Sequence, residues 1–225
     1  LFLMSKLFKK KKILITGSSG FVGKYVLKNL DQKKYSITLV NRKKIAGYKN
    51  IIVKDFFKLK ISDYIKLLQN QDIVLHLAWY TEPGKYFNSY INFECLLGSI
   101  NFVIASKITK VKKFIGIGTC LEYLPQKQKL KPTDKMKGNS IYSASKIMLY
   151  KFCISLFKNT SIKFSWCRMF YLYGDGEPKL KLYSYVKTQI KKKRTAKLSS
   201  GNQIKDFIHI SDAALKLIEV IENNK

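Results

Sequence analysis

A glycine-rich turn between a buried strand and an amphipathic helix constrains the fold of this chain more than any other feature. Residues 13–15 form a short, continuously apolar run, which is typical of a strand buried on both faces of a parallel sheet. From residue 21 to residue 30, apolar side chains recur at helical spacing. The glycines between these two segments therefore predict a strand–turn–helix unit.

Each glycine of this turn meets a different steric need. Gly17 permits a tight turn, Gly20 lets the backbone approach a pyrophosphate, and Gly23 lets the helix pack closely on the strand. The start of the helix also presents N–H groups to an anion. The spacing Gly-x-x-Gly-x-x-Gly differs from the usual Gly-x-Gly-x-x-Gly, and a flexible loop after a strand is the alternative. We predict that the turn binds a dinucleotide through Gly17, Ser18, Ser19, Gly20, Phe21, Val22 and Gly23.

The end of the second predicted strand bears on which dinucleotide the chain binds. An acidic side chain about twenty positions after the glycines would accept hydrogen bonds from the ribose of NAD, whereas an arginine suits the 2′-phosphate of NADP. This chain has Asn41 and Arg42 at that point and no carboxylate. We therefore expect NADP, bound by both residues. NAD stays open, because Arg42 is one cation among many.

A tyrosine and a lysine four residues apart predict proton transfer beside that cofactor. Tyr142 and Lys146 fall on a helix predicted from Ser140 onward, and residues at i and i+4 share a helix face. A free phenol has a pKa of about 10, but an adjacent ammonium and an oxidised nicotinamide both favour the phenolate. Tyr142 can then exchange a proton with a carbinol oxygen during hydride transfer, and Lys146 can also bind the nicotinamide ribose. Tyr183 and Lys187 have the same spacing, so chance is the alternative.

Strands alternate with helices along the chain, which predicts a parallel sheet with right-handed crossovers. We expect strands at 12–16, 36–40, 50–53, 72–77, 112–118 and 162–168, and helices at 20–31, 62–69, 86–106, 140–158, 180–192 and 211–223. The fold class is therefore α/β, a doubly wound parallel-sheet Rossmann fold.

The order of these motifs resembles the extended short-chain dehydrogenase/reductase family, in particular its group of nucleotide-sugar epimerases, dehydratases and reductases (the NAD-dependent epimerase/dehydratase family). The likeness runs from about residue 12 to about residue 220. It is carried by Thr-Gly-Ser-Ser-Gly-Phe-Val-Gly at 16–23, Val-Leu-His-Leu-Ala at 74–78, Phe-Ile-Gly-Ile-Gly-Thr at 114–119, the Tyr142 and Lys146 pair, Arg-Met-Phe-Tyr-Leu-Tyr-Gly at 168–174 and Gly-Asn-Gln-Ile-Lys-Asp-Phe-Ile-His-Ile-Ser-Asp at 201–212.

The resemblance implies further site residues. Thr119 falls where the family places a catalytic hydroxyl that holds the carbonyl oxygen of the substrate, so Thr119, Tyr142 and Lys146 form the implied catalytic set. Cofactor contacts are implied for Asp55, Phe56, Leu77, Ala78, Trp79, Asn92 and Phe170, and substrate contacts for Thr119, Tyr171 and Lys205. The plain alternatives are that Thr119 is an ordinary strand-end hydroxyl and that Asp55 caps a turn.

The residues after Thr119 bear on the reaction. Family dehydratases carry Asp-Glu directly after the catalytic threonine, whereas this chain has Cys120 and Leu121, so dehydration is disfavoured. Segment 76–84 resembles that of reductases that make 6-deoxyhexoses on a nucleoside-diphosphate carrier. Together with the expectation of NADP, this favours NADPH reduction of a 4-keto-6-deoxyhexose. NAD-dependent 4-epimerisation of a nucleotide sugar is the alternative.

Three segments are expected along the chain. Residues 1–11 form a basic N-terminal leader, residues 12–170 the dinucleotide-binding domain, and residues 171–225 a partial substrate-binding region with a returning Rossmann segment. The chain is shorter than is usual for the family, so we expect the substrate-binding region to be truncated at its C-terminus.

The charge of the chain is less easily explained. Its 43 Lys+Arg residues face 14 Asp+Glu residues, which gives a net charge of +29. These cations form no single stripe interleaved with aromatic residues, so we expect no nucleic-acid partner. Two pyrophosphate-bearing ligands would explain part of this charge, and a proteome in which lysine replaces other surface residues is the preferred explanation for the rest. Weak association with anionic membranes stays open, as does RNA binding by a non-catalytic dinucleotide-binding protein.

Cysteine and histidine usage predicts neither a metal site nor a disulfide scaffold. The four cysteines lack metal-ligand spacing, and His76 and His209 are expected to be structural. Reduced thiols indicate a cytoplasmic protein. The family resemblance implies a homodimer formed through the helices that contain Asn92 and Tyr142.

Overall fold

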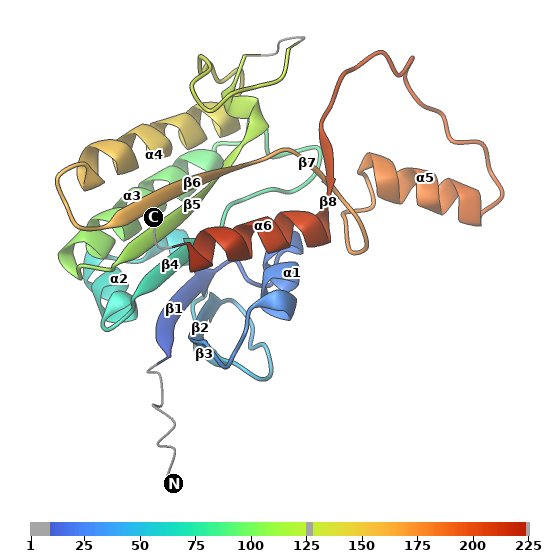
Figure 1. The fold of residues 1–225 in the computed structure, drawn as a ribbon. Coiled ribbons are helices and arrows are strands. Elements are labelled where there is room, and N and C mark those ends of the chain that lie inside the picture. The colour runs from blue at the N-terminus through green and yellow to red at the C-terminus, as the bar shows by residue number, and fades with distance from the viewer. Residues whose placement is uncertain (1–9, 125–127, 224–225) are drawn as a thin grey trace, which may run out of the picture.

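A six-stranded, wholly parallel sheet forms the centre of the molecule, with helices on both of its faces (Figure 1). The computed structural model describes residues 10–124 and 128–223. The strand order is β3-β2-β1-β4-β5-β6, so the chain changes direction across the sheet between β1 and β4. This confirms the predicted doubly wound α/β fold, whose ligands bind at such a switch point.

The elements follow the predicted alternation. The sheet strands are β1 (Lys11–Thr16), β2 (Tyr35–Asn41), β3 (Lys49–Ile52), β4 (Ile73–His76), β5 (Lys113–Thr119) and β6 (Lys163–Met169). The helices are α1 (Phe21–Asn29), α2 (Ile61–Leu68), α3 (Ile91–Ile108), α4 (Ile141–Phe157), α5 (Leu182–Lys191) and α6 (Ile210–Glu222). Two 3₁₀ turns, η1 (Phe56–Lys58) and η2 (Cys120–Glu122), follow β3 and β5. Residues 1–9 of the predicted leader lie outside the described residues.

Alternation along the central strand separates two hydrophobic cores. On β1, Ile13 and Ile15 pack with α1 and α6, whereas Leu14 packs with α2, α3 and α4 on the opposite face. All three side chains are fully buried. Full burial of such a side chain contributes about 1.5–3 kcal/mol. The continuously apolar run at 13–15 is therefore explained by helices on both faces of the sheet.

Helix α3 is long and apolar enough, by length and composition alone, to cross a membrane, with a mean hydropathy of 1.3 over 18 residues. Half of that window is buried inside the molecule. The helix lies between α2 and α4 (Figure 1) and buries the polar side chains of Asn92, Ser99 and Ser106. Its hydrophobicity is that of a core helix.

Two predictions about the elements were wrong. The helix predicted for 86–106 begins at Ile91, because the chain before it turns: the N–H groups of Lys85 and Tyr86 both donate to the carbonyl of Glu82 at 3.1 Å. A second, parallel pair of strands, β7 (Tyr171–Tyr173) and β8 (Phe207–His209), was not predicted at all. Each of these strands has only three residues, which is too short for a pattern of alternating hydrophobicity.

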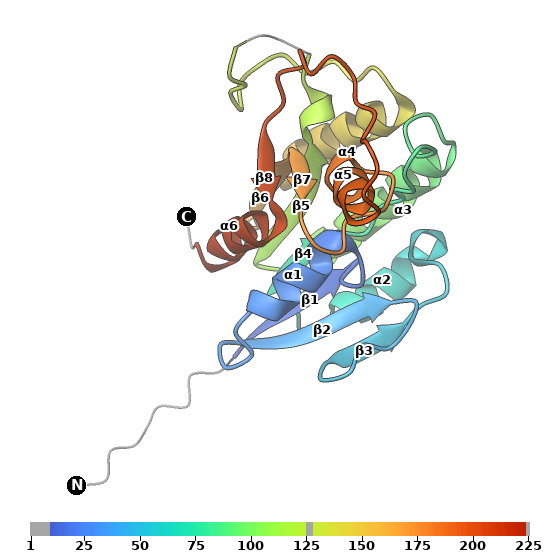
Figure 2. The same cartoon turned by 90° about the vertical axis from the view of Figure 1, so that its right-hand side faces the viewer.

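The last part of the chain leaves the sheet and then returns to it. Helix α5 lies to the side of the main body, near the β7 and β8 pair (Figures 1 and 2). The chain comes back through β8, and α6 then packs beside α1 on the sheet. This path agrees with a returning segment, while the division into domains at residue 170 stays a prediction.

Candidate functional site

The glycine turn brings the end of β1 against the end of β4. Gly17 has a φ of +70°, and a Cβ atom there would lie 2.6 Å from the backbone nitrogen of Ala78. A Cβ atom at Gly23 would lie 2.5 Å from the Cα atom of Ser18. At Gly20 the nearest atom would be 3.2 Å away. The tight turn at Gly17 and the close helix packing at Gly23 are therefore both present, and the chain itself requires glycine at these two positions.

The start of α1 is suited to an anion. Its N-cap residue, Gly20, has no side chain to accept from the first N–H groups, and the first turn carries no acidic residue. Such N–H groups need an acceptor from outside the helix. Ser19 is exposed beside them, whereas Phe21 and Val22 are half-buried. The predicted phosphate-binding residues thus surround a helix end with free donors.

Asn41, at the end of β2, holds the turn from the other side. The Ser18 hydroxyl donates to Oδ1 of Asn41 at 2.8 Å. The Nδ2 atom of Asn41 is buried and has no hydrogen-bond partner among the described residues. A buried donor without an acceptor costs free energy, so this amide fits a hydroxyl or phosphate oxygen of a bound dinucleotide. Arg42 follows directly and is exposed.

A buried polar network supports the turn. The Thr16 hydroxyl lies 2.7 Å from Nδ1 of His76 and accepts from the N–H of Ala78 at 3.2 Å. The Leu77 N–H donates to the Thr16 carbonyl, and Nε2 of His76 lies 2.9 Å from the Ser99 hydroxyl on α3. Burial lowers the pKa of His76 to about 3, so this ring is neutral. His76 is structural, as predicted, but it is hydrogen-bonded as well as packed.

Helix α4 carries Lys146 into the interior of the site. Its side chain is 5% exposed, and Nζ donates to the carbonyl of Ile117 at 2.8 Å. The same nitrogen lies 3.7 Å from the centre of the Trp79 ring, a cation–π contact. Burial lowers the pKa of Lys146 to about 7, although the charge of Glu122 raises it in part. Lys146 therefore titrates near neutral pH.

Tyr142 and Thr119 meet at the end of β5. Tyr142 is buried, and its pKa is raised by burial and by Tyr86, while a hydrogen bond with the Thr119 side chain lowers it in part. Without a cofactor, burial raises the pKa of the Tyr142 phenol above its ordinary value, and the lowering by an oxidised nicotinamide stays a prediction. At neutral pH, Tyr142 carries its proton. The structure still brings together the three residues of the implied catalytic set.

Asn92 holds the aromatic support of this site. Its Oδ1 atom accepts from the Trp79 indole N–H at 2.9 Å, and its Nδ2 atom donates to the carbonyls of Tyr86 and Ser89. Tyr86 in turn packs edge-on against the Tyr142 ring, with 4.8 Å between ring centres. Asn92 and Trp79, both expected to contact cofactor, are thus tied to the catalytic set by direct contacts.

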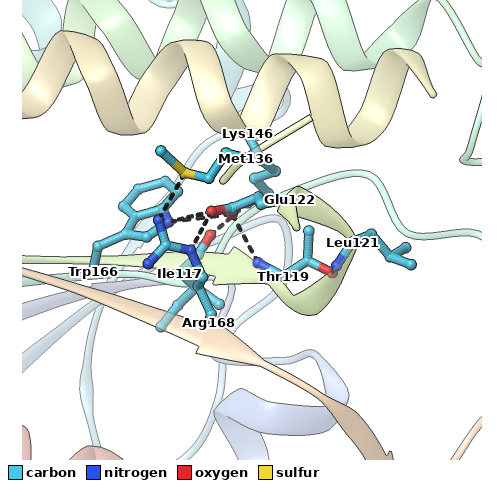
Figure 3. Close-up of polar contacts among 8 residues, drawn as sticks. All are labelled: Ile117, Thr119, Leu121, Glu122, Met136, Lys146, Trp166 and Arg168. Atoms are coloured by element: carbon cyan, nitrogen blue, oxygen red, sulfur yellow. Dashed lines mark hydrogen bonds and ion pairs between the residues drawn. The ribbon is translucent and has the colours of Figure 1, made fainter. Parts of the chain in front are cut away.

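Glu122 and Arg168 were missed as site residues by the sequence-based predictions. The buried carboxylate of Glu122 accepts from the backbone N–H of Thr119 at 2.9 Å and from Nε of Arg168 at 2.6 Å (Figure 3). A signal for Glu122 was present. Thr119 and Glu122 form a Thr-x-x-Glu capping box around η2. Nothing in the sequence pairs Arg168 with this carboxylate.

Two predicted cofactor residues, Asp55 and Phe56, have structural contacts. The Asp55 carboxylate accepts from the N–H of Phe57 at 3.1 Å and caps η1. The Phe56 ring packs against His76 and Tyr64 in the core. A cofactor contact for either residue stays a prediction.

The residues predicted after β6 lie in the segment that leaves the sheet and in the loop before β8. Phe170 and Tyr171 are half-buried where β6 passes into β7. Cys120 acts electrostatically on Tyr171, which places that ring near the end of β5. Lys205 is exposed, with Nζ 4.8 Å from the centre of the Tyr171 ring. These positions are compatible with contacts to substrate.

A separate cavity of about 710 Å³ lies between α5 and the β7 and β8 pair. It is lined by none of the predicted site residues, but by Tyr173, Glu177, Leu182, Tyr183, Val186, Lys187, Ile190, Lys191 and Phe207. Within the described ranges, no three His, Cys, Asp or Glu side chains gather as metal ligands would. All four cysteines are free thiols.

Comparison with known proteins gives a match over almost the whole chain. The model of the NAD-dependent epimerase/dehydratase family matches residues 13–225. Among curated relatives, the dTDP-6-deoxy-L-talose 4-dehydrogenase (NAD(+)) of Aggregatibacter actinomycetemcomitans is 23% identical, in an alignment that covers 93% of this chain and 79% of the relative. The CDP-abequose synthase of Salmonella typhimurium is 24% identical, over 97% of this chain and 72% of its own.

Solved structures have the same fold. The UDP-glucuronic acid 4-epimerase from Bacillus cereus, in complex with UDP-glucuronic acid and NAD, superposes with a TM-score of 0.80 at 23% identity. The superposition covers 95% of this chain and 74% of the epimerase. At this level of identity, the likeness establishes the fold.

The buried lysine predicts how stability depends on pH. The pKa of Lys146 falls from 10.5 to about 7 on folding, so between these values the unfolded chain binds the extra proton and folding becomes more favourable as pH rises. Relative to Lys146→Met, the free energy of unfolding of the parent should rise by about 2 kcal/mol from pH 7 to pH 9. Urea unfolding of both proteins at the two pH values measures this. Parallel pH dependences would show that the lysine is not buried as described.

Proposed function

We propose, since this chain belongs to the NAD-dependent epimerase/dehydratase family, that it is an oxidoreductase acting at carbon 4 of a nucleoside-diphosphate sugar. One observation carries the proposal. The side chains of Thr119 and Tyr142 are hydrogen-bonded at the carboxyl end of β5, where the Lys146 ammonium donates to the Ile117 carbonyl of the same strand. This is the edge of the sheet at which the glycine turn follows β1. Ligands of doubly wound sheets bind at this edge. The family and its relatives are enzymes of the short-chain dehydrogenase/reductase type.

In the reducing direction, Tyr142 would act as the proton donor. Since burial raises the pKa of Tyr142, its phenol is a proton donor at neutral pH. Tyr142 gives this proton to the carbonyl oxygen of the sugar while the carbonyl carbon receives hydride, so the product carries a hydroxyl group. A bound reduced dinucleotide supplies the hydride. Thr119 hydrogen-bonds the same oxygen, and Lys146 binds the nicotinamide ribose.

Two reactions at carbon 4 have support. The relative named dTDP-6-deoxy-L-talose 4-dehydrogenase supports oxidoreduction of a 6-deoxyhexose. We place reduction of a 4-keto-6-deoxyhexose first because Arg42, in place of a carboxylate after β2, favours NADPH. The structural likeness to a UDP-glucuronic acid 4-epimerase bound to NAD supports 4-epimerisation as the second candidate. A reductase exchanges its cofactor at each turnover, whereas an epimerase keeps NAD bound and recycles it.

A preference for NADP is part of this proposal. Arg42 is exposed directly after β2, and the preceding residue, Asn41, has a buried Nδ2 atom without a hydrogen-bond partner among the described residues. A guanidinium can bind a 2′-phosphate through charge-assisted hydrogen bonds. The solved UDP-glucuronic acid 4-epimerase from Bacillus cereus and MoeE5 are both named as complexes with NAD, so the preference for NADP depends on Asn41 and Arg42 of this chain.

We also propose a homodimer in which α3 and α4 of two copies pack together. Phe93, Leu97 and Ile108 are about half exposed, and their spacing puts them on one face of α3. Met148 on the adjacent α4 is 58% exposed. A run of exposed apolar side chains on neighbouring helices is typical of an interface. A cytoplasmic location and weak association with anionic membranes remain predictions.

Tyr142→Phe should abolish the proposed reaction without unfolding the protein. Loss of a proton donor typically costs a factor of about 10²–10⁴ in rate. The assay follows oxidation of NADPH with CDP-, dTDP- and GDP-4-keto-6-deoxyhexoses, and interconversion of UDP-sugars in parallel. Tyr48→Phe is the matched control, because its hydroxyl donates to the Leu27 carbonyl away from the site. Equal activity of Tyr142→Phe and the parent would disprove the proposal.

Arg42→Ala should weaken the use of NADPH and leave NADH unaffected. Loss of a charge-assisted contact is worth about 1.5–3 kcal/mol, so KM for NADPH should rise about tenfold to a hundredfold. Lys43→Ala, the neighbouring exposed cation, controls for a general loss of positive charge. If both variants raise KM equally for both cofactors, Arg42 steers anions but does not recognise the 2′-phosphate.

Phe93→Glu combined with Leu97→Glu should convert the dimer into a monomer, because two like charges from each copy would face each other in an apolar interface. Size-exclusion chromatography with light scattering measures the mass at micromolar concentration. Leu215→Glu changes a comparably exposed leucine on α6 and should leave the mass unchanged. A parent protein that runs as a monomer at these concentrations contradicts the dimer.

A further inference from the structure

Glu122 lies buried beneath the candidate site, with donors around both of its oxygens. Its side chain is fully inaccessible to solvent. Oε1 accepts from the backbone N–H of Thr119 at 2.9 Å, and Oε2 accepts from Nε of Arg168 at 2.6 Å. The indole N–H of Trp166 lies 3.1–3.2 Å from the two oxygens. Figure 3 shows the carboxylate between Arg168 and the helix that carries Lys146.

Two glycines of β5 make room for this arrangement. A Cβ atom at Gly118 would lie 2.3 Å from Oε1 of Glu122 and 2.2 Å from the indole nitrogen of Trp166. A Cβ atom at Gly116 would lie 2.5 Å from the same indole ring. No side chain fits at either position without displacing the indole or the carboxylate. The strand that ends at Thr119 is therefore built around Glu122.

Charges near Glu122 come from several elements. Arg168 on β6 forms a buried ion pair with it, the side chains being 10% and 0% exposed. The guanidinium also stacks on the rings of Tyr123 and Tyr150, 4.8 and 4.6 Å from their centres. The other titratable groups that feel the carboxylate are Cys120, Tyr123, Tyr142 and Lys146. Of these, Lys146 is the cation.

We infer that Glu122 is a positioning residue for the site: it fixes the backbone of Thr119 at the end of β5 and places a negative charge beneath the helix that carries Lys146. The hydrogen bond to the Thr119 N–H fixes the backbone that carries this hydroxyl, and the carboxylate opposes the effect of burial on the pKa of the lysine. The inference relies on the proposed function for the roles of Thr119 and Lys146. The effect on the charge of Lys146 can be measured without turnover.

The test is a pH titration of Trp79 fluorescence in the full chain, which reports on Lys146 because Nζ lies 3.7 Å from that ring. Trp79→Phe, measured in parallel, identifies the contribution of Trp166. Glu122→Gln removes the negative charge and should lower the titration midpoint by about one pH unit or more. Arg168→Gln removes the positive charge that neutralises the Glu122 carboxylate, so this variant should raise the titration midpoint. Both variants break the same ion pair, so a merely structural role would move both midpoints in the same direction.

Opposite shifts support the inference, whereas unchanged midpoints or shifts in one direction overturn it. If Glu122→Gln does not fold, Arg168→Gln decides alone: an upward shift supports the inference and any other result overturns it. Glu122→Asp keeps the negative charge, so its titration midpoint should stay near the parent value. Its side chain is shorter by one methylene group and no longer accepts the hydrogen bond from the Thr119 N–H, so kcat should fall. Opposite midpoint shifts without any turnover of a nucleotide sugar would contradict the proposed function alone, and turnover with unshifted midpoints would contradict this inference alone.

Discussion

The contact between two backbone segments, the glycine turn after β1 and the end of β4, sets the geometry of the whole site. A Cβ atom at Gly17 would lie 2.6 Å from the backbone nitrogen of Ala78, so nothing larger than glycine lets the segments approach. Thr16 then binds the Ala78 N–H and His76, and His76 reaches Ser99 on α3. The position of α3 relative to the turn is therefore fixed by hydrogen bonds through a neutral, buried imidazole. Since α3 also carries the asparagine that holds Trp79, the phosphate-binding end and the catalytic end of the cleft form one rigid unit.

Burial away from water affects the ionisation of Tyr142 and Lys146 more than neighbouring charges do. Tyr142 and Lys146 lie on one turn of α4, as their spacing requires, yet neither takes the ionisation expected from the pair alone. Burial disfavours the charged form of both, raising the pKa of the phenol and lowering that of the amine. The site thus holds a neutral acid beside a lysine that is only partly protonated near pH 7. Local partners such as Glu122 then decide the charge state, because in a dry site a single fixed charge has a large effect.

Sequence patterns predicted what is local and failed where contacts are distant in the chain. The alternation of strands and helices and the glycine turn could be predicted, because apolar runs, helical periodicity and the steric needs of Gly17 and Gly23 are all local. The start of α3 at Ile91 could not, because it depends on turns closed by the carbonyl of Glu82. The pair of Glu122 and Arg168 spans 46 positions, and no local pattern joins them. The ionisation of Tyr142 and Lys146 could not be predicted for the same reason, since burial is a property of the packed molecule.

The net charge of +29 makes the buried ion pair of Glu122 and Arg168 more important to the site. Surface ion pairs such as Lys34 with Glu222 and Lys216 with Glu219 are solvent-exposed, and water screens most of their attraction. The unbalanced lysines create a positive field that attracts pyrophosphate-bearing ligands. That same field favours deprotonation of a buried amine, since a like charge disfavours the charged form. Salt screens the surface field over about 8 Å at physiological ionic strength, whereas a carboxylate in contact with the site is screened far less. Glu122 therefore supplies a negative charge to the site that does not depend on the ionic conditions around a strongly basic protein.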